Sequence, residues 1–321
     1  MTVSVVVPAY NAARFIVPTL DAVLEQSAPA DEILVLDDGS SDATRTVLAR
    51  YGRAVTVLSQ PNRGVACARN RLCACAGGDL VAFLDHDDVW HPDYLAVQRR
   101  NFESWPQAVA LFTGHVDIAD GATPRWDSPT VADRPAWLID AADFLPFHAR
   151  RTACFASMSY CCMPRQVLAG LGAQPFPVAV SGADDYYLCN LLPLLGPVVC
   201  DTAALVAYRY TAAAQSADQL RSCRLAVQAL DLLDECYRSA ASAPLRREFE
   251  AVYSAKSRHY AKLLLGQGRC RQARHELHRA LRVGGGARSR LKTSALWLAS
   301  LLPRAWQPPW LPAQRVERLP S

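Results

Sequence analysis

Apolar and polar positions alternate along the first third of the chain in blocks of strand length and helix length. Each apolar block has four or five residues, too few for an ordinary helix, and lacks the alternation of a half-exposed strand. Such runs are typical of strands buried on both faces. The repetition predicts a mostly parallel sheet with right-handed crossovers and helices on both faces. The expected strands are 3–7, 33–36, 55–58, 80–84 and 109–112, and the expected helices are 12–26, 42–52, 64–76 and 92–104.

Polar residues follow four of these expected strands, at the point where each strand ends. Parallel strands carry their carboxyl ends at one edge of a sheet, where open α/β sheets bind ligands, so we expect the functional site there. No G-x-G-x-x-G follows the first strand and no G-x-x-x-x-G-K-[ST] occurs, which excludes a Rossmann dinucleotide fingerprint and a P-loop. The four polar segments are 8–11, 37–42, 60–64 and 85–88.

Three carboxylates follow the strand 80–84 within four positions: Asp85, Asp87 and Asp88. They repel one another unless a cation or donor groups offset the charge, and a cluster of oxygen ligands suits Mg²⁺ or Mn²⁺ better than zinc. The alternative is a helix cap, with Asp88 as N-cap and Pro92 in the first turn. A cap needs only one acid, so we favour a metal or ligand site.

Two further segments offer polar groups to the same edge. Asp38 lies just past a buried strand and can accept hydrogen bonds from a base N–H or from ribose hydroxyls, whereas Asp42 is expected to cap the next helix. Gly64 allows close approach of the backbone to a ligand. Arg69 suits a phosphate, although a plain surface charge explains it nearly as well.

Beyond residue 112 the pattern is less regular. Residues 114–150 show no clear periodicity and are expected to form a loop or small subdomain that shapes a substrate site. We expect a strand over 153–163 and a short helix over 164–171. Asp184 and Asp185 then precede a helix-like run that ends at residue 195. Their negative charges either stabilise the helix by interacting with the positive end of its dipole, or one of them supplies a general base.

Together these segments resemble the motifs of the family 2 inverting glycosyltransferases in order and spacing, from residue 3 to about 210. The resemblance implies a glycosyltransferase A-type fold: a Rossmann-like, mostly parallel sheet flanked by helices. It also implies a nucleotide-diphosphate sugar donor and Mg²⁺ or Mn²⁺. The matching segments are Pro8-Ala9-Tyr10-Asn11, Gln26 with Pro29 and Glu32, the run from Ile33 to Asp42, Asn62-Arg63-Gly64 with Ala68-Arg69-Asn70, the run from Leu84 to Asp88, and Gly182-Ala183-Asp184-Asp185.

The resemblance also implies roles for residues on the donor side. Asp38 matches the acid that recognises the nucleotide base, which we expect to be uracil because of its frequency in the family. Asp85-His86-Asp87 occupy the DxD motif, where Asp87 would coordinate the metal and Asp85 would lie near the ribose or sugar. Arg209 could contact phosphate, but the histidine often found a few residues later is absent from 211–215. The implied donor-binding residues are Pro8, Tyr10, Asp38, Asn62, Arg69, Asp85, His86 and Arg209.

On the acceptor side, Asp185 matches the family's catalytic base. Asp184 stands where the family usually has Glu, which preserves both charges and implies an acceptor contact. A carboxylate base removes the proton of the acceptor hydroxyl as its oxygen attacks the anomeric carbon, and one in-line displacement inverts the configuration. We expect Asp184 to raise the pKa of Asp185 by like-charge repulsion. The expected acceptor is a glycan or a lipid-linked sugar, in the synthesis of a surface polysaccharide or glycolipid.

Two other functions fit some of these features. A nucleotidyltransferase can also use an α/β sheet with paired acids, but it would release pyrophosphate rather than a nucleoside diphosphate. If the protein were a catalytically silent, donor-binding scaffold, its C-terminal region would carry the function. The retention of Asp85, Asp87 and Asp185 favours the metal-dependent inverting glycosyltransferase.

The last third of the chain is predicted to be helical. We expect a catalytic domain over 1–213 and a helical region over 214–321, in which 260–283 resembles one hairpin repeat of the tetratricopeptide type. The favoured role for these helices is packing against the catalytic domain. Arginines and lysines next to a short apolar, tryptophan-bearing segment suggest membrane contact through residues 288–311, with docking on the protein's own surface as an equal alternative.

Composition narrows the remaining possibilities for this chain of 321 residues. A net charge of +4 is too small to argue for a nucleic-acid partner. Eleven cysteines, an odd number without CxxC pairs, argue against a disulfide framework or a zinc ribbon and favour a reducing cytoplasmic location. The N-terminal residues lack a signal peptide, and no apolar run reaches the length of a spanning helix, so we expect at most a peripheral position at the inner face of a membrane.

Overall fold

The computed structural model describes residues 1–126, 136–140, 143–145, 157–210, 218–284 and 286–301. The chain divides into two compact units, Met1–Ala217 and Asp218–Ser321. The domain boundary predicted between residues 213 and 214 lies outside the described residues. Within the described part of the chain, no helix combines the length and the apolar character needed to cross a membrane.

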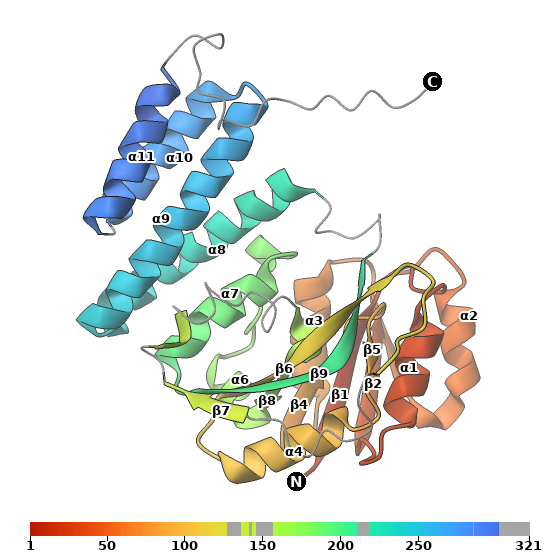
Figure 1. Cartoon of the computed structure of the whole chain (residues 1–321). Helices are drawn as coiled ribbons and strands as arrows, with labels where there is room; N and C mark the ends of the chain where they lie inside the picture. Colours follow the sequence, from red (N-terminus) through yellow and green to blue (C-terminus); the bar gives the residue numbers. More distant parts are fainter. Residues whose placement is uncertain (127–135, 141–142, 146–156, 211–217, 285, 302–321) are drawn as a thin grey trace, which may run out of the picture. The chain divides into compact units, whose positions relative to one another are not determined.

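The first unit is built on one mixed sheet with the strand order β3-β2-β1-β4-β8-β6-β9-β5, and β7 pairs with β9 (Figure 1). Its first half is parallel, as the apolar runs predict, and the expected fold class is confirmed. The side chains of β1 and β4 are buried throughout. These first four strands are β1 (Val3–Ala9), β2 (Glu32–Asp37), β3 (Thr56–Ser59) and β4 (Leu80–Phe83).

The second half of the sheet contains antiparallel pairs. β8 (Cys161–Pro164) runs antiparallel to both β4 and β6 (Ala110–Ala119). β5 (Val89–Trp90) and β7 (Ala136–Ile139) run antiparallel to β9 (Val198–Tyr210). β6 and β9 are parallel, with a register shift at Gly114, where an added Cβ would meet two carbonyl oxygens of β9 at 3.2 Å. The glycine therefore allows these two long strands to stay paired beyond the bulge.

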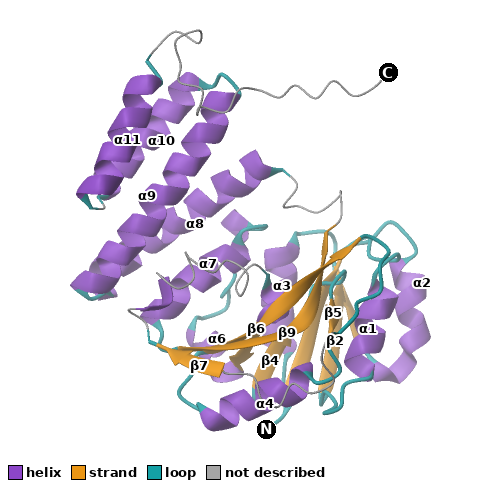
Figure 2. Cartoon of the chain, viewed as in Figure 1, coloured by secondary structure: helices purple, strands orange, loops and turns teal. Residues whose placement is uncertain are grey.

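Helices cover the sheet, as Figure 2 shows. α3 packs against β1 and β2, and α4 packs against β6 and β9. The helices begin later or end sooner than the predicted segments, and the second continues as a 3₁₀ turn over Ala49–Ala54. Of the predicted strand 153–163, residues 153–156 lie outside the described part, and Met158–Tyr160 form a 3₁₀ turn before β8. The described α-helices of this unit are α1 (Ile16–Leu24), α2 (Thr44–Leu48), α3 (Val65–Cys75), α4 (Tyr94–Ser104), α6 (Arg165–Gly170) and α7 (Asp184–Leu191).

The second unit is a helical bundle. Its first two helices each begin with a side-chain cap. Asp218 accepts a hydrogen bond from the Arg221 amide, and Ser242 accepts one from the Leu245 amide. Tyr237 and Phe249 stack at 3.9 Å between ring centroids in the core. The helices are α8 (Gln219–Ala240), α9 (Ala243–Gly266), α10 (Cys270–Val283) and α11 (Ala287–Ala299). Of the segment 288–311 predicted to contact a membrane, residues 302–311 lie outside the described part.

Candidate active site

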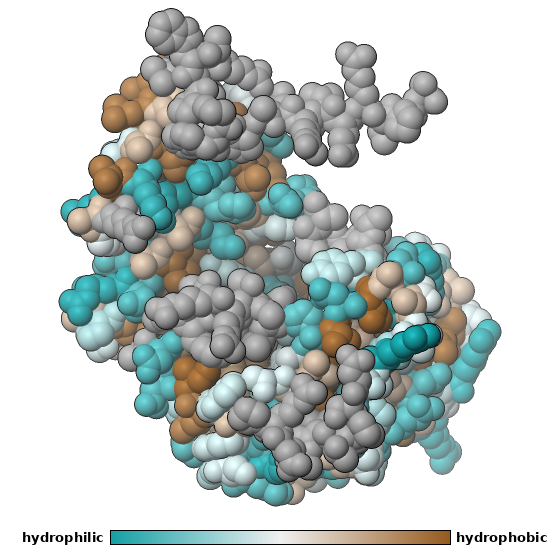
Figure 3. Space-filling model, in the orientation of Figure 1, coloured by the Kyte–Doolittle hydropathy of each residue, from teal (hydrophilic) through white to brown (hydrophobic). Residues whose placement is uncertain are grey.

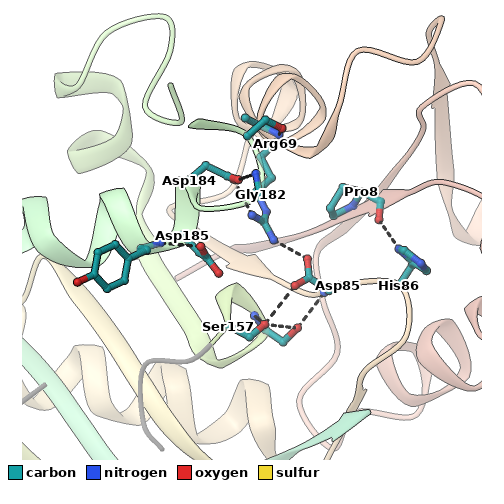
Figure 4. Close-up of polar contacts among 12 residues, drawn as sticks. Pro8, Arg69, Asp85, His86, Ser157, Gly182, Asp184 and Asp185 are labelled. Carbon is teal, nitrogen blue, oxygen red and sulfur yellow. Dashed lines mark hydrogen bonds and ion pairs between the residues drawn. The ribbon is translucent and has the colours of Figure 1, made fainter. Parts of the chain in front are cut away.

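A single buried arginine joins two acidic segments that are far apart in the sequence. Arg69 lies on α3 and is only 4% exposed. Its Nη2 donates to Asp85 Oδ1 at 2.6 Å and its Nη1 to Asp184 Oδ2 at 2.6 Å (Figure 4). Burial alone would lower the pKa of Arg69, but the carboxylates of Asp85 and Asp184 outweigh it and raise the pKa. The guanidinium therefore stays charged and fixes the end of β4 against the start of α7.

Asp85 is held by two serines as well as by Arg69. Its Oδ2 accepts a hydrogen bond from the Ser157 hydroxyl at 3.1 Å, and its backbone N–H donates to Ser159 Oγ at 3.0 Å. Burial opposes ionisation, yet the charge of Arg69 outweighs it and lowers the pKa of Asp85. Asp85 is thus an ionised carboxylate with both oxygens engaged. Nothing in the sequence motifs pointed to Ser157 or Ser159, which lie more than seventy residues away along the chain.

Burial and repulsion among the carboxylates raise the pKa of both neighbouring acids, Asp87 and Asp88. Burial raises the pKa of Asp87, with Asp85 adding to the effect and His86 opposing it. Asp88 is almost fully buried, accepts a hydrogen bond from the Arg209 amide at 3.0 Å, and has its pKa raised by burial and by Asp87. Asp87 is half-buried. The arrangement fits a divalent cation, since added positive charge would relieve the repulsion among these carboxylates.

No set of three or more His, Cys, Asp or Glu side chains that could form a metal cage occurs among the described residues. A cation here would therefore take one or two carboxylates from the protein and complete its shell with water and substrate oxygens, as Mg²⁺ usually does. The donor atoms that Asp87 offers are consistent with that mode of binding.

Asp184 and Asp185 occupy the first turn of α7 but differ in their surroundings. Asp184 is fully buried, and its second oxygen accepts a hydrogen bond from the Gly182 amide at 2.8 Å. Asp185 is half-buried and accepts a hydrogen bond from the Tyr186 amide at 2.6 Å. Burial, with the charge of Asp184 adding to it, raises the pKa of Asp185 to about 6. The repulsion expected from Asp184 is thus present, as the largest cause of the raised pKa after burial.

The remaining residues predicted on the β1 and β2 sides lie at the same edge of the sheet. His86 Nδ1 is 3.2 Å from the Pro8 carbonyl oxygen, a pairing that requires the ring proton on Nδ1 (Figure 4). Tyr10 is 45% exposed, and Asn62 is exposed as well. Asp42, predicted to cap this helix, accepts a hydrogen bond from the Thr44 amide in the first turn of α2, but the N-cap residue itself is Ala43.

Asp38 holds the loop that follows β3. Its Oδ1 accepts hydrogen bonds from Gln60 Nε2 at 2.7 Å and from the Arg63 amide at 2.9 Å, and its Oδ2 accepts one from the Gly64 amide at 2.8 Å. Each carboxylate oxygen has about two lone-pair positions, so Oδ2 retains one acceptor position for a ligand N–H. The sequence did not indicate that Asp38 also orders this loop.

Arg209 is largely committed to the protein itself. Its Nε donates to the Asp87 carbonyl at 3.0 Å, and its Nη1 donates to the carbonyls of Ala119 and Ala122 at 3.2 and 3.1 Å. The guanidinium also lies 5.5 Å from the ring centroid of Phe15. Arg209 therefore fixes the backbone of Asp87, and only its Nη2 is left without a described partner.

With this geometry established, comparison with known proteins decides the family. The family model for glycosyl transferase family 2 matches residues 4–169, slightly more than half of the chain. The chain belongs to glycosyl transferase family 2. All four predicted strand-end segments lie within the matched range, whereas Asp184, Asp185 and Arg209 lie beyond it.

Named glycosyltransferases match part of the chain. The putative teichuronic acid biosynthesis glycosyltransferase TuaG of Bacillus subtilis is 40% identical over 126 residues, which are 38% of this chain and 50% of TuaG. The UDP-Glc:α-D-GlcNAc-diphosphoundecaprenol β-1,3-glucosyltransferase WfgD of Escherichia coli is 38% identical over 98 residues, which are 30% of this chain and 39% of WfgD. The chain thus matches half or less of the length of these relatives.

The structural similarity covers more of the chain than the sequence similarity does. The mannosyltransferase PcManGT of Pyrobaculum calidifontis, solved in complex with GDP-Man and Mn²⁺, matches with a TM-score of 0.60 over 95% of this chain and 82% of that one. The two sequences are 22% identical. The match confirms the predicted glycosyltransferase A-type fold.

Proposed function

We propose that the protein transfers a sugar from a nucleotide-diphosphate sugar to an acceptor hydroxyl with inversion at the anomeric carbon. The observation that carries the proposal is the bridge formed by Arg69 between Asp85 and Asp184. It brings the acids after β4, which match the donor-binding motif, next to the acids at the start of α7, which include the base candidate. A transferase needs both groups within one site.

Asp185 is the proposed catalytic base. A raised pKa of about 6 suits this role, because the carboxylate is mostly ionised at neutral pH yet binds a proton better than an ordinary aspartate. In the reaction the acceptor O–H bond breaks, the proton moves to Asp185, and the acceptor oxygen bonds to the anomeric carbon. The bond from that carbon to the leaving diphosphate oxygen breaks, and its electron pair leaves with the nucleoside diphosphate.

The donor is proposed to bind along the ends of β1, β2 and β4. Asp38 would accept a hydrogen bond from the base, with Tyr10 and Asn62 beside it. Asp87 would hold Mg²⁺ or Mn²⁺, whose positive charge stabilises the departing diphosphate. Two similar proteins support this class of donor and metal: the name of WfgD gives UDP-Glc as its donor, and PcManGT was solved with GDP-Man and Mn²⁺. We favour a UDP-sugar.

Asp184 is proposed as a positioning residue. The resemblance implied an acceptor contact, but its burial and its hydrogen bonds to Arg69 and Gly182 favour a structural role toward Asp185. The acceptor itself is proposed to be a glycan or a lipid-linked sugar. The names of TuaG and WfgD, which refer to teichuronic acid biosynthesis and to a diphosphoundecaprenol-linked sugar, support that choice.

Calorimetric titration with UDP, GDP and TDP, with and without Mn²⁺, tests the donor site. We expect metal-dependent binding of one diphosphate by the wild-type protein and its loss in Asp87→Ala. Asp31→Ala is a control, since Asp31 is exposed and pairs with Arg99 before the amino end of β2, at the opposite edge of the sheet from the strand ends of the site. Binding that depends on neither the metal nor Asp87 would refute the assignment of the donor site.

Product analysis separates the alternatives. A glycosyltransferase incubated with its donor releases a nucleoside diphosphate, whereas a nucleotidyltransferase given a nucleoside triphosphate releases pyrophosphate. We expect Asp185→Asn to keep donor binding and to lose turnover by roughly a hundredfold or more. A protein that binds donor but never turns over, with or without Asp185, would be a silent scaffold.

A further inference from the structure

Charge is distributed very unevenly between the two units. Residues 218–321 contain 19 arginines and lysines against eight acids, a net charge of +11, which leaves −7 for residues 1–217 within the chain's +4. The imbalance is strongest over 251–301, where eleven arginines and lysines accompany one acid, Glu276. Glu276 is buried and lies 3.6 Å from Arg279, so it contributes no exposed negative charge. This part of the chain therefore carries an excess of positive charge that would attract an anionic partner.

The exposed face of α10 is a basic stripe, which we define as Arg271, His275, His278 and Arg282. All four side chains are exposed and recur at the three- and four-residue spacing of one helix face. None of them forms an ion pair with a described residue. At 1.5 Å per residue the stripe extends about 16 Å along the helix. Exposed arginines that do not form salt bridges within the protein are available to an external anion.

α11 adds an exposed apolar face beside this helix. Leu291 is 71% exposed and Leu298, two turns later, is 60% exposed, while Leu301 just after the helix is 52% exposed. The helix contains no acid, and Arg290 and Lys292 flank Leu291. Figure 3 shows apolar side chains gathered over α11, next to hydrophilic ones. Large apolar side chains in this number on one short helix mark an interaction surface.

α10 and α11 act as one piece. The two helices pack against each other, and Arg274 Nη1 donates to the Ser300 carbonyl at 3.3 Å. The opposite faces of the two helices, which include Leu277 and Leu296, are buried within the unit. The basic stripe and the exposed leucines therefore belong to one rigid helical pair that is anchored in the bundle.

We propose that this helical pair binds the surface of an anionic lipid bilayer. The basic stripe would lie among phosphate headgroups, and Leu291, Leu298 and Leu301 would enter the interface, as in interfacial helices with one basic and one apolar face. A nucleic acid would satisfy the charge but offers nothing to the exposed leucines. The surface lies outside the donor site, so the proposal stands or falls separately from the glycosyl transfer.

Co-sedimentation of the full-length protein with lipid vesicles tests the proposal. We expect binding to vesicles of phosphatidylcholine mixed with phosphatidylglycerol, little binding to phosphatidylcholine alone, and weaker binding as salt rises. The double variant Arg271→Glu/Arg282→Glu should bind about tenfold more weakly or worse, because each basic side chain near a charged bilayer contributes severalfold. Leu291→Ser/Leu298→Ser should also lose about tenfold or more through its lost apolar burial.

The matched control is Arg224→Glu/Arg247→Glu, which makes the same change of charge at exposed positions on α8 and α9. We expect its binding to change less than about threefold. Calorimetry with UDP on every variant checks that the donor site is intact. Equal binding to both vesicle types, or none to either, would overturn the proposal. So would tight binding to duplex DNA that the leucine substitutions leave unchanged, since that would indicate a nucleic-acid partner.

Discussion

Asp184 and Asp185 are adjacent in sequence and chemically opposite in their surroundings. The carboxylate of Asp184 is fixed by Arg69 and by the Gly182 amide. Among the described residues, the carboxylate of Asp185 forms no salt bridge and accepts a hydrogen bond only from an amide of its own helix. One acid is thus held by two donors of the protein, while the other is left able to accept a proton.

The first prediction concerns the dependence of activity on pH. Because the pKa of Asp185 is raised to about 6, the base is protonated and inactive below that value and ionised above it. We expect kcat/KM to rise with pH through about 6 and to level off near neutrality, with a loss of about tenfold for each pH unit below the midpoint. A profile that is flat from pH 5 to 8 would contradict the assignment. Donor binding measured over the same range controls for effects on the acids after β4.

The second prediction concerns Arg69→Lys. An ammonium group has the same charge but cannot present two N–H groups in a fixed fork to two carboxylates. We expect the free energy of unfolding to fall by about 2 kcal/mol, because one buried acid loses its partner, and kcat to fall by at least about tenfold. Chemical denaturation measures the free energy of unfolding, and initial rates give kcat.

Arg71→Lys is the control for that variant. Arg71 lies on the same helix but is exposed and donates to the Ser59 carbonyl, which a lysine can also reach. Its stability and rate should stay near those of the wild-type protein. If both variants behave alike, the bridge between Asp85 and Asp184 has no special role.

Sequence reasoning located the acids of the site but not their partners. Asp85, Asp87 and Asp185 could be predicted because strand ends and short motifs are local features of the sequence. The hydrogen bonds that join Asp85 to Ser157 and to Ser159, and the one from Arg69 to Asp184, span 72 to 115 residues. Which of many serines and arginines would meet an acid depends on tertiary packing, which local patterns do not encode.

At the scale of elements, the turn after β2 depends on a glycine. Gly39 has a positive φ of +75°, and a Cβ there would lie 2.6 Å from the Asn62 backbone nitrogen. The close approach brings the turn after β2 against the loop after β3, which Asp38 also holds through three hydrogen bonds. These two loops therefore keep a fixed relative position at the proposed base-binding end of the site.

The third prediction is that Gly39→Ala weakens nucleotide binding and stability together. The positive φ and the clash with backbone should cost about 1–3 kcal/mol, and affinity for the preferred nucleoside diphosphate should fall by about tenfold. Thermal denaturation and calorimetry give the two readouts. Gly52→Ala is the matched control, since Gly52 also has a positive φ, +55°, but nothing lies within 4 Å of an added Cβ. If nucleotide affinity falls equally in both, the contact with Asn62 is not what matters.

The elements predicted from the sequence were those with continuous apolar runs. β1, β2 and β4 are buried, so their composition alone indicates a strand. β3 was also predicted, but it is the edge strand of the sheet and its side chains are mostly exposed. β5 has two residues and β7 four, and each is a strand only because β9 lies beside it. Since their pairing is non-local, no periodicity in their own sequence could have indicated it.

At the scale of the whole molecule, the chain contains two units with separate means of stabilisation. In the helical unit, Arg279 Nη1 donates to Asp231 Oδ2 at 2.6 Å, and the Tyr253 hydroxyl donates to the other oxygen of Asp231. These contacts join α8, α9 and α10 through the partly exposed side chains of Asp231 and Arg279 and the buried side chain of Tyr253. The network joins residues of the second unit, whereas the residues of the proposed donor site belong to the first.

The fourth prediction is that Arg279→Met destabilises the helical unit alone. Asp231 is more than one-third exposed, so solvent screens the pair and the loss should be about 1 kcal/mol. We expect a lower midpoint for unfolding of the helices, followed by circular dichroism, and unchanged affinity for UDP. Arg238→Met removes an exposed pair with Asp234 within α8 and should lower the midpoint less. A fall in UDP affinity in Arg279→Met would show that the two units are energetically coupled.

The guanidinium shared by Asp85 and Asp184 limits how this site can change over evolutionary time. A neutral side chain at position 184 would leave Arg69 with one acid, and a neutral side chain at position 69 would leave two carboxylates without a buried counter-ion. Either single step is costly, while a joint replacement of Arg69 and Asp184 removes both the cation and one anion and costs less. We therefore expect these positions to have been exchanged in concert among homologous chains, so that compensating pairs are found where single replacements are absent.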